Sequence, residues 1–306
     1  MELSNTTPSE HRLSRELENF LDIAMSILPQ PGEVPRLDGI DVWGGTLPFS
    51  GAVGGDHIIY VDFKQRFDLA ARITDARRRG QAVVAERLDL CRRRAGIALI
   101  DVAGHRMTDA LLAAMLHQAF LVGALYELDM FGQITRNLFE NLNTRFHQSS
   151  GAHKFMSLIY GEISEDARFR FLSAAQPMPL IFSRQHDRFV DIGPDLHVSF
   201  PPLGMLPSLD VIDRNAAPPG EMGFKERYAI NEWWLMGAGD ILLLHTDGLV
   251  EHGPDQAPYY PRRLEQRVRE VKDLGARAIF EAIGQDLLAF AELSDDVSLV
   301  VVKLAA

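Results

Sequence analysis

The segment ILLLHTDGLVE, residues 241–251, is an apolar run that stops at a carboxylate followed by a glycine. Residues 241–245 have the length and composition of a buried strand. Asp247 then stands where the edge of the core should be, and a carboxylate placed there needs water, a partner or a ligand. Three further apolar strands of the chain have acids in the same kind of position, so this segment introduces both the fold and the function.

These other acids lie at the ends of separate strands. Asp101 follows GIALI directly, Asp56 precedes HIIYV, and Asp295 with Asp296 precedes VSLVVV. In an antiparallel sheet the end of one strand lies beside the beginning of its neighbour, so the acids could meet along one rim. Gathered carboxylates repel each other, and an all-oxygen site selects hard ions such as Mg²⁺ or Mn²⁺. A single Asp beside a glycine is more often a turn residue, so the pattern alone leaves both interpretations open.

The order of elements predicts a mixed α+β fold. Short strand-like runs follow one another through the second half of the chain, and joining them by tight turns implies antiparallel pairing. Helical patterns occupy about residues 107–126, 131–148, 261–273 and 276–290. Because these helices come in groups between groups of strands, we expect layers of helix and sheet.

Composition narrows the function classes. The chain has 306 residues, 46% of them hydrophobic, a net charge of −11 and a single cysteine, Cys91. The negative charge argues against general binding to nucleic acid, and the lone cysteine suggests a reducing compartment, which we take as the cytoplasm. We find no signal-peptide pattern and no apolar run that approaches the roughly 20 residues of a membrane span, so we expect no membrane partner.

Two segments stand apart from this plan. Residues 9–28 have apolar positions at helical spacing and predict an amphipathic helix. Residues 64–94 contain ten Lys and Arg against four acids within an otherwise acidic chain, and their composition is helical with Gly80 as a division. This insert, at about 64–95, is either a solvated hairpin that protects a sheet edge or a docking surface for an acidic partner near the rim of the active site.

Five ordered motifs resemble the PPM-type (PP2C-like) metal-dependent serine/threonine phosphatases of bacteria, specifically the SpoIIE and RsbU-like branch. The motifs are LDIAMSILPQPGEVPRLDGIDV, AVGGDHIIYVDF, GIALIDVAGHRMTDALLAAML, GDILLLHTDGLVE and SDDVSLVVVKL, and the resemblance extends over about residues 15–304. It implies a four-layer α-β-β-α sandwich of two antiparallel sheets flanked by helices. It also divides the chain into an N-terminal linker or regulatory helix, residues 1–30, and a phosphatase domain, residues 31–306.

The resemblance implies a site with two Mn²⁺ or Mg²⁺ ions and a metal-activated water as nucleophile. The metal ligands would be Asp56, Asp101, Asp247 and Asp295, directly or through water, together with the backbone carbonyl of Val102. Asp101 would bridge both ions, and Asp295 is preferred over Asp296 because the family's ligand is the first acid of that motif.

The implied substrate is phosphoserine or phosphothreonine on a small regulatory protein, such as a phosphorylated STAS-like anti-sigma-factor antagonist. A homodimer through the N-terminal helix would parallel the family. Two rival functions stay open. One is a catalytically inactive pseudophosphatase that acts as a binding or scaffold protein, and the other is a hydrolase of small phosphate esters.

The chain departs from the family pattern at several positions. Arg106 replaces a glycine after the motif histidine His105 and could hold a substrate phosphate oxygen, although a solvated residue at a helix start would look the same. Gln176, in SAAQP, replaces a histidine. His105 is interpreted as a turn residue with proton transfer as the alternative, and His245 as a hydrogen-bonded core histidine.

Overall fold

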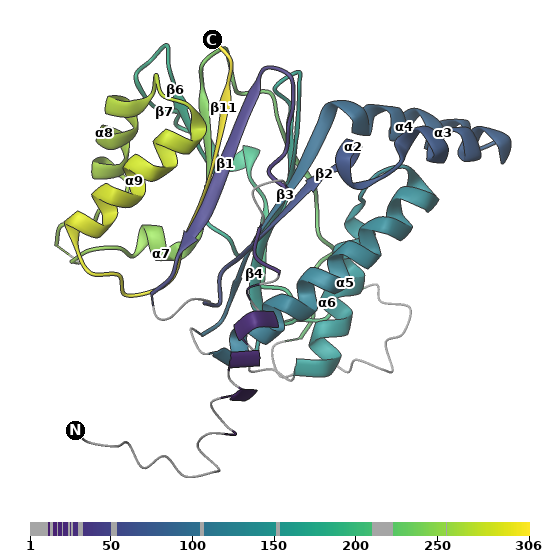
Figure 1. Cartoon of the computed structure of the whole chain (residues 1–306), viewed down its shortest axis with the longest axis horizontal. Coiled ribbons are helices and arrows are strands. Elements are labelled where there is room, and N and C mark those ends of the chain that lie inside the picture. Colours follow the sequence, from purple (N-terminus) through teal and green to yellow (C-terminus); the bar gives the residue numbers. More distant parts are fainter. Residues whose placement is uncertain are drawn as a thin grey trace.

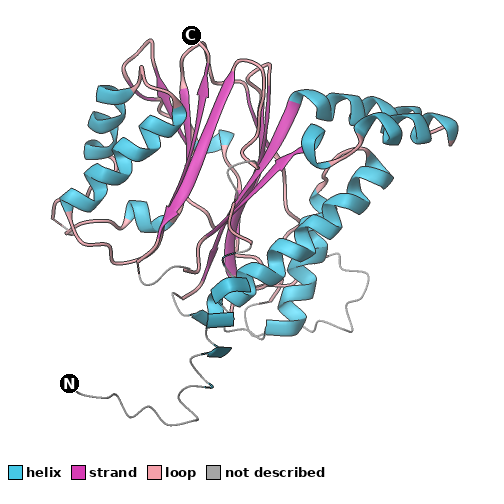
Figure 2. Ribbon diagram, in the orientation of Figure 1, coloured by secondary structure: helices cyan, strands magenta, loops and turns pink. Residues whose placement is uncertain are grey.

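The computed structural model describes residues 33–49, 54–104, 107–150, 154–209, 223–254 and 256–306, together with scattered positions between residues 12 and 29. Two β-sheets stack face to face, and helices cover the outer face of each (Figure 1, Figure 2). The predicted α-β-β-α sandwich is therefore confirmed.

The first sheet has the strand order β1-β11-β10-β6-β7, and every neighbouring pair in it is antiparallel. Its strands are β1 (Ile40–Leu47), β11 (Val297–Leu304), β10 (Ile241–His245), β6 (Leu180–Ser183) and β7 (Arg188–Phe189). The last strand of the chain thus lies between the first strand and β10, which brings both ends of the domain into one sheet.

The second sheet has the order β2-β3-β4-β5-β8, and β9 also pairs with β5. Its strands are β2 (His57–Asp62), β3 (Arg94–Val102), β4 (Met156–Ser164), β5 (Phe169–Ala174), β8 (Ser199–Phe200) and β9 (Asn231–Trp233). A two-residue parallel contact between β5 and β8 is the exception to antiparallel pairing among the described strands. The antiparallel prediction is otherwise correct.

Alternation along β10 shows why a continuous apolar run suits this position. Leu242 and Leu244 belong to the core between the sheets, whereas Ile241 and Leu243 pack against the outer helices. Successive side chains of a strand point to opposite faces, so a strand covered on both faces must be apolar throughout. The helices on this side are α8 (Arg262–Val271) and α9 (Ala276–Phe290).

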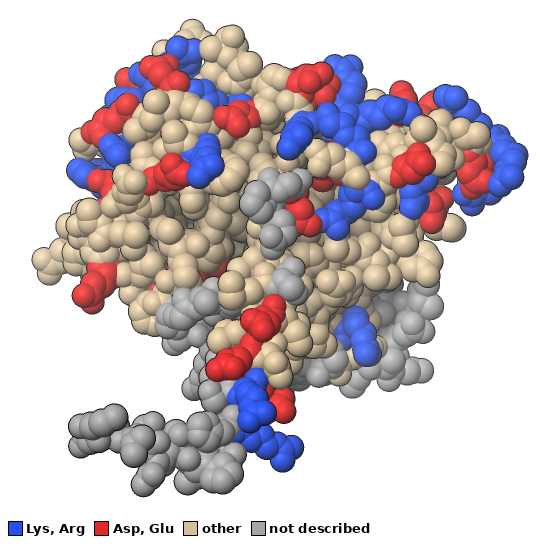
Figure 3. Space-filling model, viewed as in Figure 1, with Lys and Arg blue, Asp and Glu red and all other residues tan. Residues whose placement is uncertain are grey.

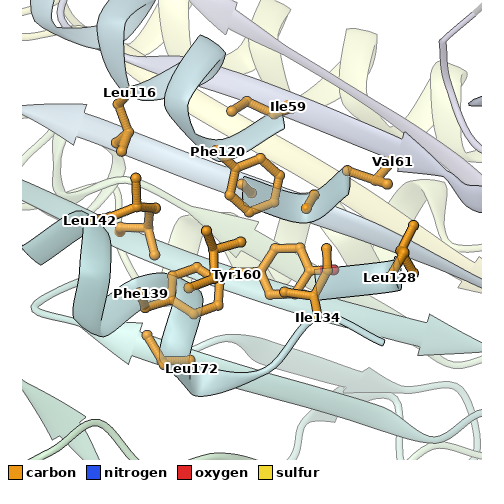
Figure 4. Close-up of a cluster of buried hydrophobic side chains, with 14 of the residues drawn as sticks. Ile59, Val61, Leu116, Phe120, Leu128, Ile134, Phe139, Leu142, Tyr160 and Leu172 are labelled. Atoms are coloured by element: carbon orange, nitrogen blue, oxygen red, sulfur yellow. The ribbon is translucent and has the colours of Figure 1, made fainter. Parts of the chain in front are cut away.

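The other outer layer consists of α5 (Met107–Phe131) and α6 (Arg136–Ser150), which pack on the second sheet. Figure 4 shows this contact, where the rings of Phe120, Phe139 and Tyr160 lie 5.3–6.2 Å apart between centroids. Tilted rings at such distances stabilise a core beyond the area that they bury. The helices are thereby fixed to β4 at the centre of the sheet.

Helix α5 corrects one expectation. Residues 109–131 have a mean hydropathy of 1.5 and are long and apolar enough to span a membrane by length and composition alone. In this fold one side of the helix is core, because Leu116, Phe120 and Leu128 are buried against the second sheet. The expectation that no apolar run approaches the length of a membrane span is therefore corrected for this segment.

The basic insert forms α2 (Phe63–Arg66), the helical hairpin α3 (Leu69–Arg78) and α4 (Ala82–Leu90), and a single 3-10 turn, η1 (Cys91–Arg93). Gly80 has φ +71° at the predicted division between the two helices. The hairpin joins the sheet where Asp62 pairs with Ala95, whereas His57 pairs with Ile100 at the other end. The hairpin therefore lies at the far end of the sheet from Asp56 and Asp101 (Figure 1), which does not fit the alternative of a docking surface near the active-site rim.

Basic side chains cover the free end of this hairpin (Figure 3). Much of their charge is matched within the protein: Arg72 pairs with Asp129, Arg93 with Glu165, and both Arg78 and Arg79 with Asp75. These contacts favour the hairpin as a solvated element that is tied to the domain surface.

The described positions within residues 12–25 are helical, in agreement with the predicted N-terminal helix. Most of its predicted apolar face lies outside the described residues. A short helix, α7 (Asp247–Val250), follows β10, and the turn η2 (Pro194–Leu196) precedes β8.

Candidate metal centre

The strand ends bring the predicted acids to one edge of the sandwich. Asp56 directly precedes β2 and Asp101 is the penultimate residue of β3, and the pairing of His57 with Ile100 makes these two acids neighbours. On the facing sheet, Asp247 comes two residues after β10 ends and Asp295 two residues before β11 begins. Each sheet thus contributes one acid that precedes a strand and one from the end of a strand.

Hydrogen bonds connect the two sheets at this edge. The Thr246 hydroxyl donates to Oδ2 of Asp56 at 2.8 Å and accepts from the backbone N–H of Ser298 at 3.0 Å. The Thr246 N–H in turn donates to the Ser298 carbonyl at 3.1 Å. Thr246 is fully buried, so the carboxylate of Asp56 is oriented from the opposite sheet.

The carboxylates act on one another electrostatically. Burial raises the pKa of Asp56 well above its usual value, and the negative charge of Asp101 is the second cause. Burial also raises the pKa of Asp101, to about 7, and the charges of Asp247 and Asp295 add to the effect. Asp101 is therefore coupled electrostatically to each of Asp56, Asp247 and Asp295.

The donor set fits a hard divalent cation. Among the described residues, the largest electrostatic effects on the pKa of Asp56 and Asp101 come from burial and from other carboxylates, and the nearby Lys154 is paired with Asp109. Across the described ranges no three His, Cys, Asp or Glu side chains already converge as a cage, so the case for an ion rests on donor chemistry and charge. Oxygen donors of this kind favour Mg²⁺ or Mn²⁺ over zinc or copper.

Gly55 keeps the backbone of the Asp101 turn close to Asp56. A Cβ on Gly55 would lie 2.6 Å from the Gly104 carbonyl oxygen and 2.9 Å from that of Val102. The N–H of Val102 also donates to the Gly55 carbonyl at 3.3 Å. Only glycine permits this approach, which places the Val102 carbonyl next to the acids.

The neighbouring acids Asp295 and Asp296 have different environments. Both oxygens of Asp296 accept from backbone N–H groups, of Phe49 and of Gly55, each at 2.8 Å, and its side chain is buried. A Cβ on Gly54 would lie 1.8 Å from Oδ2 of Asp296, which explains the glycine at that position. Asp296 thereby holds the loop, and its charge also acts on Asp56. Asp295 is half-buried, its Oδ1 accepts from the Asp296 N–H at 2.8 Å, and its charge acts on Asp101.

An ion pair between Asp109 and Lys154, which we did not predict from the sequence, stabilises the turn after β3. Gly104 has φ +112°, and a Cβ there would lie 2.6 Å from Oδ2 of the fully buried Asp109. Asp109 pairs with Lys154, whose Nζ also donates to the Ala103 carbonyl at 3.3 Å. The position of Asp109 in the first turn of a predicted helix was the available signal, but nothing pointed to Lys154.

Of the sequence predictions for the histidines and Arg106, the structure tests only the one for His245. His245 is buried and its Nδ1 lies 3.1 Å from the Thr246 carbonyl, which confirms a hydrogen-bonded core histidine. His57 Nε2 lies 2.6 Å from His117 Nδ1, a buried contact between β2 and α5 that we did not predict. His105 and Arg106 lie outside the described residues, so their predicted roles remain predictions.

A cavity of about 200 Å³ opens beside Asp56 and is lined by Thr46, Gly54 and Ile58 among others. A larger cavity, of about 730 Å³, lies around Asp41 and Lys303 at the opposite end of the first sheet. We associate the chemistry with the edge beside the smaller cavity, because Asp56 lines that cavity and none of the four acids lines the larger one.

Comparisons with known proteins agree with this fold. The family model of stage II sporulation protein E (SpoIIE) matches residues 92–305, a span that contains three of the four acids. No curated protein matches the chain. The SiaA-PP2C domain of Pseudomonas aeruginosa is similar with a TM-score of 0.64 and 14% identity, covering 98% of this chain and 100% of that domain.

Two longer structures are also similar. The RsbU and RsbW domains of Rv1364c from Mycobacterium tuberculosis are similar with a TM-score of 0.60 and 19% identity, covering 91% of this chain. The PP2C phosphatase domain of SpoIIE from Bacillus subtilis, with a fragment of its regulatory domain, is similar with a TM-score of 0.59 and 14% identity, covering 89% of this chain. The chain spans 64% and 65% of their respective lengths. Because the family model covers more than two thirds of the sequence, the chain belongs to the SpoIIE family and contains a PP2C-type phosphatase domain.

Proposed function

We propose that the chain is a metal-dependent protein serine/threonine phosphatase that holds two Mn²⁺ or Mg²⁺ ions with Asp56, Asp101, Asp247, Asp295 and the carbonyl of Val102. The observation that carries this proposal is the mutual repulsion of the acids around Asp101 at an edge that joins both sheets. Repelling carboxylates of this kind are stabilised by bound cations.

When bound, the two ions would neutralise charge on a phosphate and lower the pKa of a water molecule, so that hydroxide is available near neutral pH. The residues of the chain provide the framework. Asp101 would contact both ions, since it is coupled electrostatically to the other acids. Thr246 orients Asp56 from the opposite sheet, and Asp296 holds the loop that contains Gly55. An arrangement that is fixed in advance reduces the reorganisation needed during reaction.

We further propose that the substrate is phosphoserine or phosphothreonine on a small cytoplasmic regulatory protein of the STAS-like anti-sigma-factor-antagonist type. The support is family membership together with a similar structure that contains RsbU and RsbW domains. Residues 1–30 would serve as a linker or regulatory helix that can form a homodimer, and residues 31–306 as the phosphatase domain. Acidic overall charge is consistent with a protein partner rather than nucleic acid.

Two alternatives depend on particular features. The replacements at Arg106 and Gln176 favour a pseudophosphatase that binds a phosphoprotein without turnover. The narrow cavity beside Asp56 is also compatible with a small phosphate ester as substrate.

The test is phosphate release by the purified chain with and without Mn²⁺. Both p-nitrophenyl phosphate and a phosphorylated anti-sigma-factor antagonist would be supplied, with Asp101→Asn as the inactive control. We expect manganese-dependent turnover of both, with higher kcat/KM for the phosphoprotein, and loss of both in the variant.

Other outcomes separate the alternatives. Binding of the phosphoprotein without phosphate release would support the pseudophosphatase, and turnover of the small ester alone would support the ester hydrolase. Equal turnover by wild type and Asp101→Asn would refute the proposed site.

A further inference from the structure

Asp101 lies at the end of a chain of side-chain hydrogen bonds that starts at Gln176. Ser157 is the partner of Asp101 in the β3–β4 register, and its hydroxyl donates to Oδ2 of Asp101 at 3.2 Å. Gln176 Nε2 donates to the same Ser157 hydroxyl oxygen at 2.9 Å. Three side chains from separate parts of the second sheet therefore form one series that ends on the central acid.

The donor and acceptor capacities of the three side chains determine which atom donates in each hydrogen bond. An ionised carboxylate can only accept, and a serine hydroxyl has one hydrogen to give. If Ser157 donates to Asp101, its oxygen can only accept from Gln176, so the glutamine must present its N–H groups. The opposite amide orientation would attract the serine hydrogen and leave Oδ2 of Asp101 without that bond.

The backbone holds Gln176 in place. The preceding residue, Ala175, has φ +60°, a conformation that costs a non-glycine residue roughly 1 kcal/mol or more. Its N–H donates to the Ser199 hydroxyl at 3.2 Å, and the hydroxyl of Ser173 donates to the Gln176 carbonyl at 3.3 Å. Gln176 is 4% exposed, so a tight turn directs a buried amide toward Ser157.

We propose that Gln176 is a positioning residue for the metal centre: through Ser157 it fixes one oxygen of Asp101, so that the remaining lone pairs of the carboxylate are oriented for cations. This inference rests on the proposed function. It also gives the glutamine at the position of the family's histidine a role, since either side chain can donate an N–H. Contacts that orient a metal ligand in this way typically alter metal affinity 10–100-fold.

The experiment is calorimetric titration of Mn²⁺ into the metal-free full chain, which measures affinity without turnover. The variants are Ser157→Ala and Gln176→Met, which remove a hydrogen-bonding group at similar or smaller volume, and the double variant. Ser157→Thr and Gln176→His keep a donor at each position. Gln185→Met, in an exposed turn, is the matched control for the glutamine change.

We expect Ser157→Ala and Gln176→Met each to raise the Mn²⁺ dissociation constant about tenfold or more. The double variant should be no weaker than the worse single variant, because both changes break the same series. Ser157→Thr, Gln176→His and the control should stay within about threefold of wild type. Unfolding in urea, measured in parallel, separates loss of fold from loss of affinity.

Unchanged Mn²⁺ affinity in folded Gln176→Met, or fully additive losses in the double variant, would overturn the role of Gln176 and leave the proposed function intact. If Gln176→Met does not fold, Gln176→His and Ser157→Ala decide the question: weakened Mn²⁺ binding in Gln176→His, or unchanged binding in Ser157→Ala, would overturn the donor role. A wild-type chain that binds no Mn²⁺ would refute both this inference and the metal centre on which it rests.

Discussion

Asp295 and Asp296 are adjacent and chemically identical, yet both oxygens of Asp296 accept from loop N–H groups of distant residues, whereas Asp295 accepts from the adjacent Asp296 N–H and acts on the pKa of Asp101, which gives a sharp prediction. We expect Asp296→Asn to reduce stability and Asp295→Asn to reduce metal affinity. In Asp296→Asn one amide oxygen can still accept from an N–H, but the amide nitrogen faces the other donor, and the loop N–H groups of Phe49 and Gly55 then compete for one acceptor. The neutral amide also loses the charge that strengthens both bonds.

The size of the stability loss follows from these contacts. A hydrogen bond to a charged group contributes about 1.5–3 kcal/mol, and a buried donor left without an acceptor costs about 1–3 kcal/mol. Removing the charge also relieves its repulsion of Asp56, which acts in the opposite direction. We therefore expect the free energy of unfolding of the metal-free protein to fall by about 2–4 kcal/mol in Asp296→Asn.

Asp295→Asn should behave differently. The side chain is only half-buried, so its replacement should change stability by less than about 1 kcal/mol. Because the proposed function makes Asp295 a metal ligand, Mn²⁺ binding should weaken at least about 10–100-fold, the loss typical of changes to the outer contacts of a ligand. Urea unfolding of the metal-free protein and calorimetric titration with Mn²⁺ measure the two quantities. The reasoning is refuted if Asp296→Asn has wild-type stability, or if Asp295→Asn has wild-type affinity while Asp296→Asn has lost it.

Three further predictions concern the surroundings of the site. Gly54→Ala should lower the free energy of unfolding by about 1–3 kcal/mol, because its Cβ would overlap Asp296. Gly193→Ala is the control and should be near neutral, because the space around Gly193 is open. Wild-type stability of Gly54→Ala in urea would contradict this reasoning. Lys154→Met should lower the free energy of unfolding by roughly 1–3 kcal/mol, less than for a fully buried ion pair because Lys154 is 37% exposed. It should also weaken Mn²⁺ binding, because Lys154 holds the turn after β3, and Mn²⁺ affinity equal to wild type would contradict this. Burial lowers the pKa of His57 to about 3 and of His117 to about 4, so both are neutral in the fold but take up protons when unfolded. The raised pKa values of Asp56 and Asp101 act in the opposite direction and are shared by both proteins, so the prediction concerns the difference: relative to His117→Asn, wild type should lose stability as pH decreases from about 6.5 to 4, and parallel pH profiles would contradict this.

The strand ends that carry the acids could be recognised from the sequence, because an apolar run and the residue that ends it are local features, but preferring a metal site over turn residues depended on the family resemblance. Each of Asp56, Asp101, Asp247 and Asp295 adjoins a recognisable apolar strand, and one geometric rule places such ends together. The layers followed from the order of helices and strands for the same reason.

The contacts that hold the acids could not be predicted in this way. Ser157 lies inside an ordinary apolar strand, and Lys154 pairs with Asp109 across 45 residues of chain. Such partners depend on register and on turn conformation, for which a single sequence carries little signal. For the hairpin of residues 64–95, the docking alternative assumed a position near the rim, because composition shows that a segment is basic but not where it lies relative to the acids.

The central claim is that aspartates from both sheets hold a pair of divalent cations on either side of Asp101. The most direct measurement is anomalous diffraction at the manganese edge from crystals of the full chain grown with Mn²⁺. We predict two anomalous peaks that share Asp101 as a ligand, with Asp56, Asp247 and Asp295 around them directly or through water. Absence of any peak at this edge, or peaks whose ligands exclude Asp101, would contradict the account.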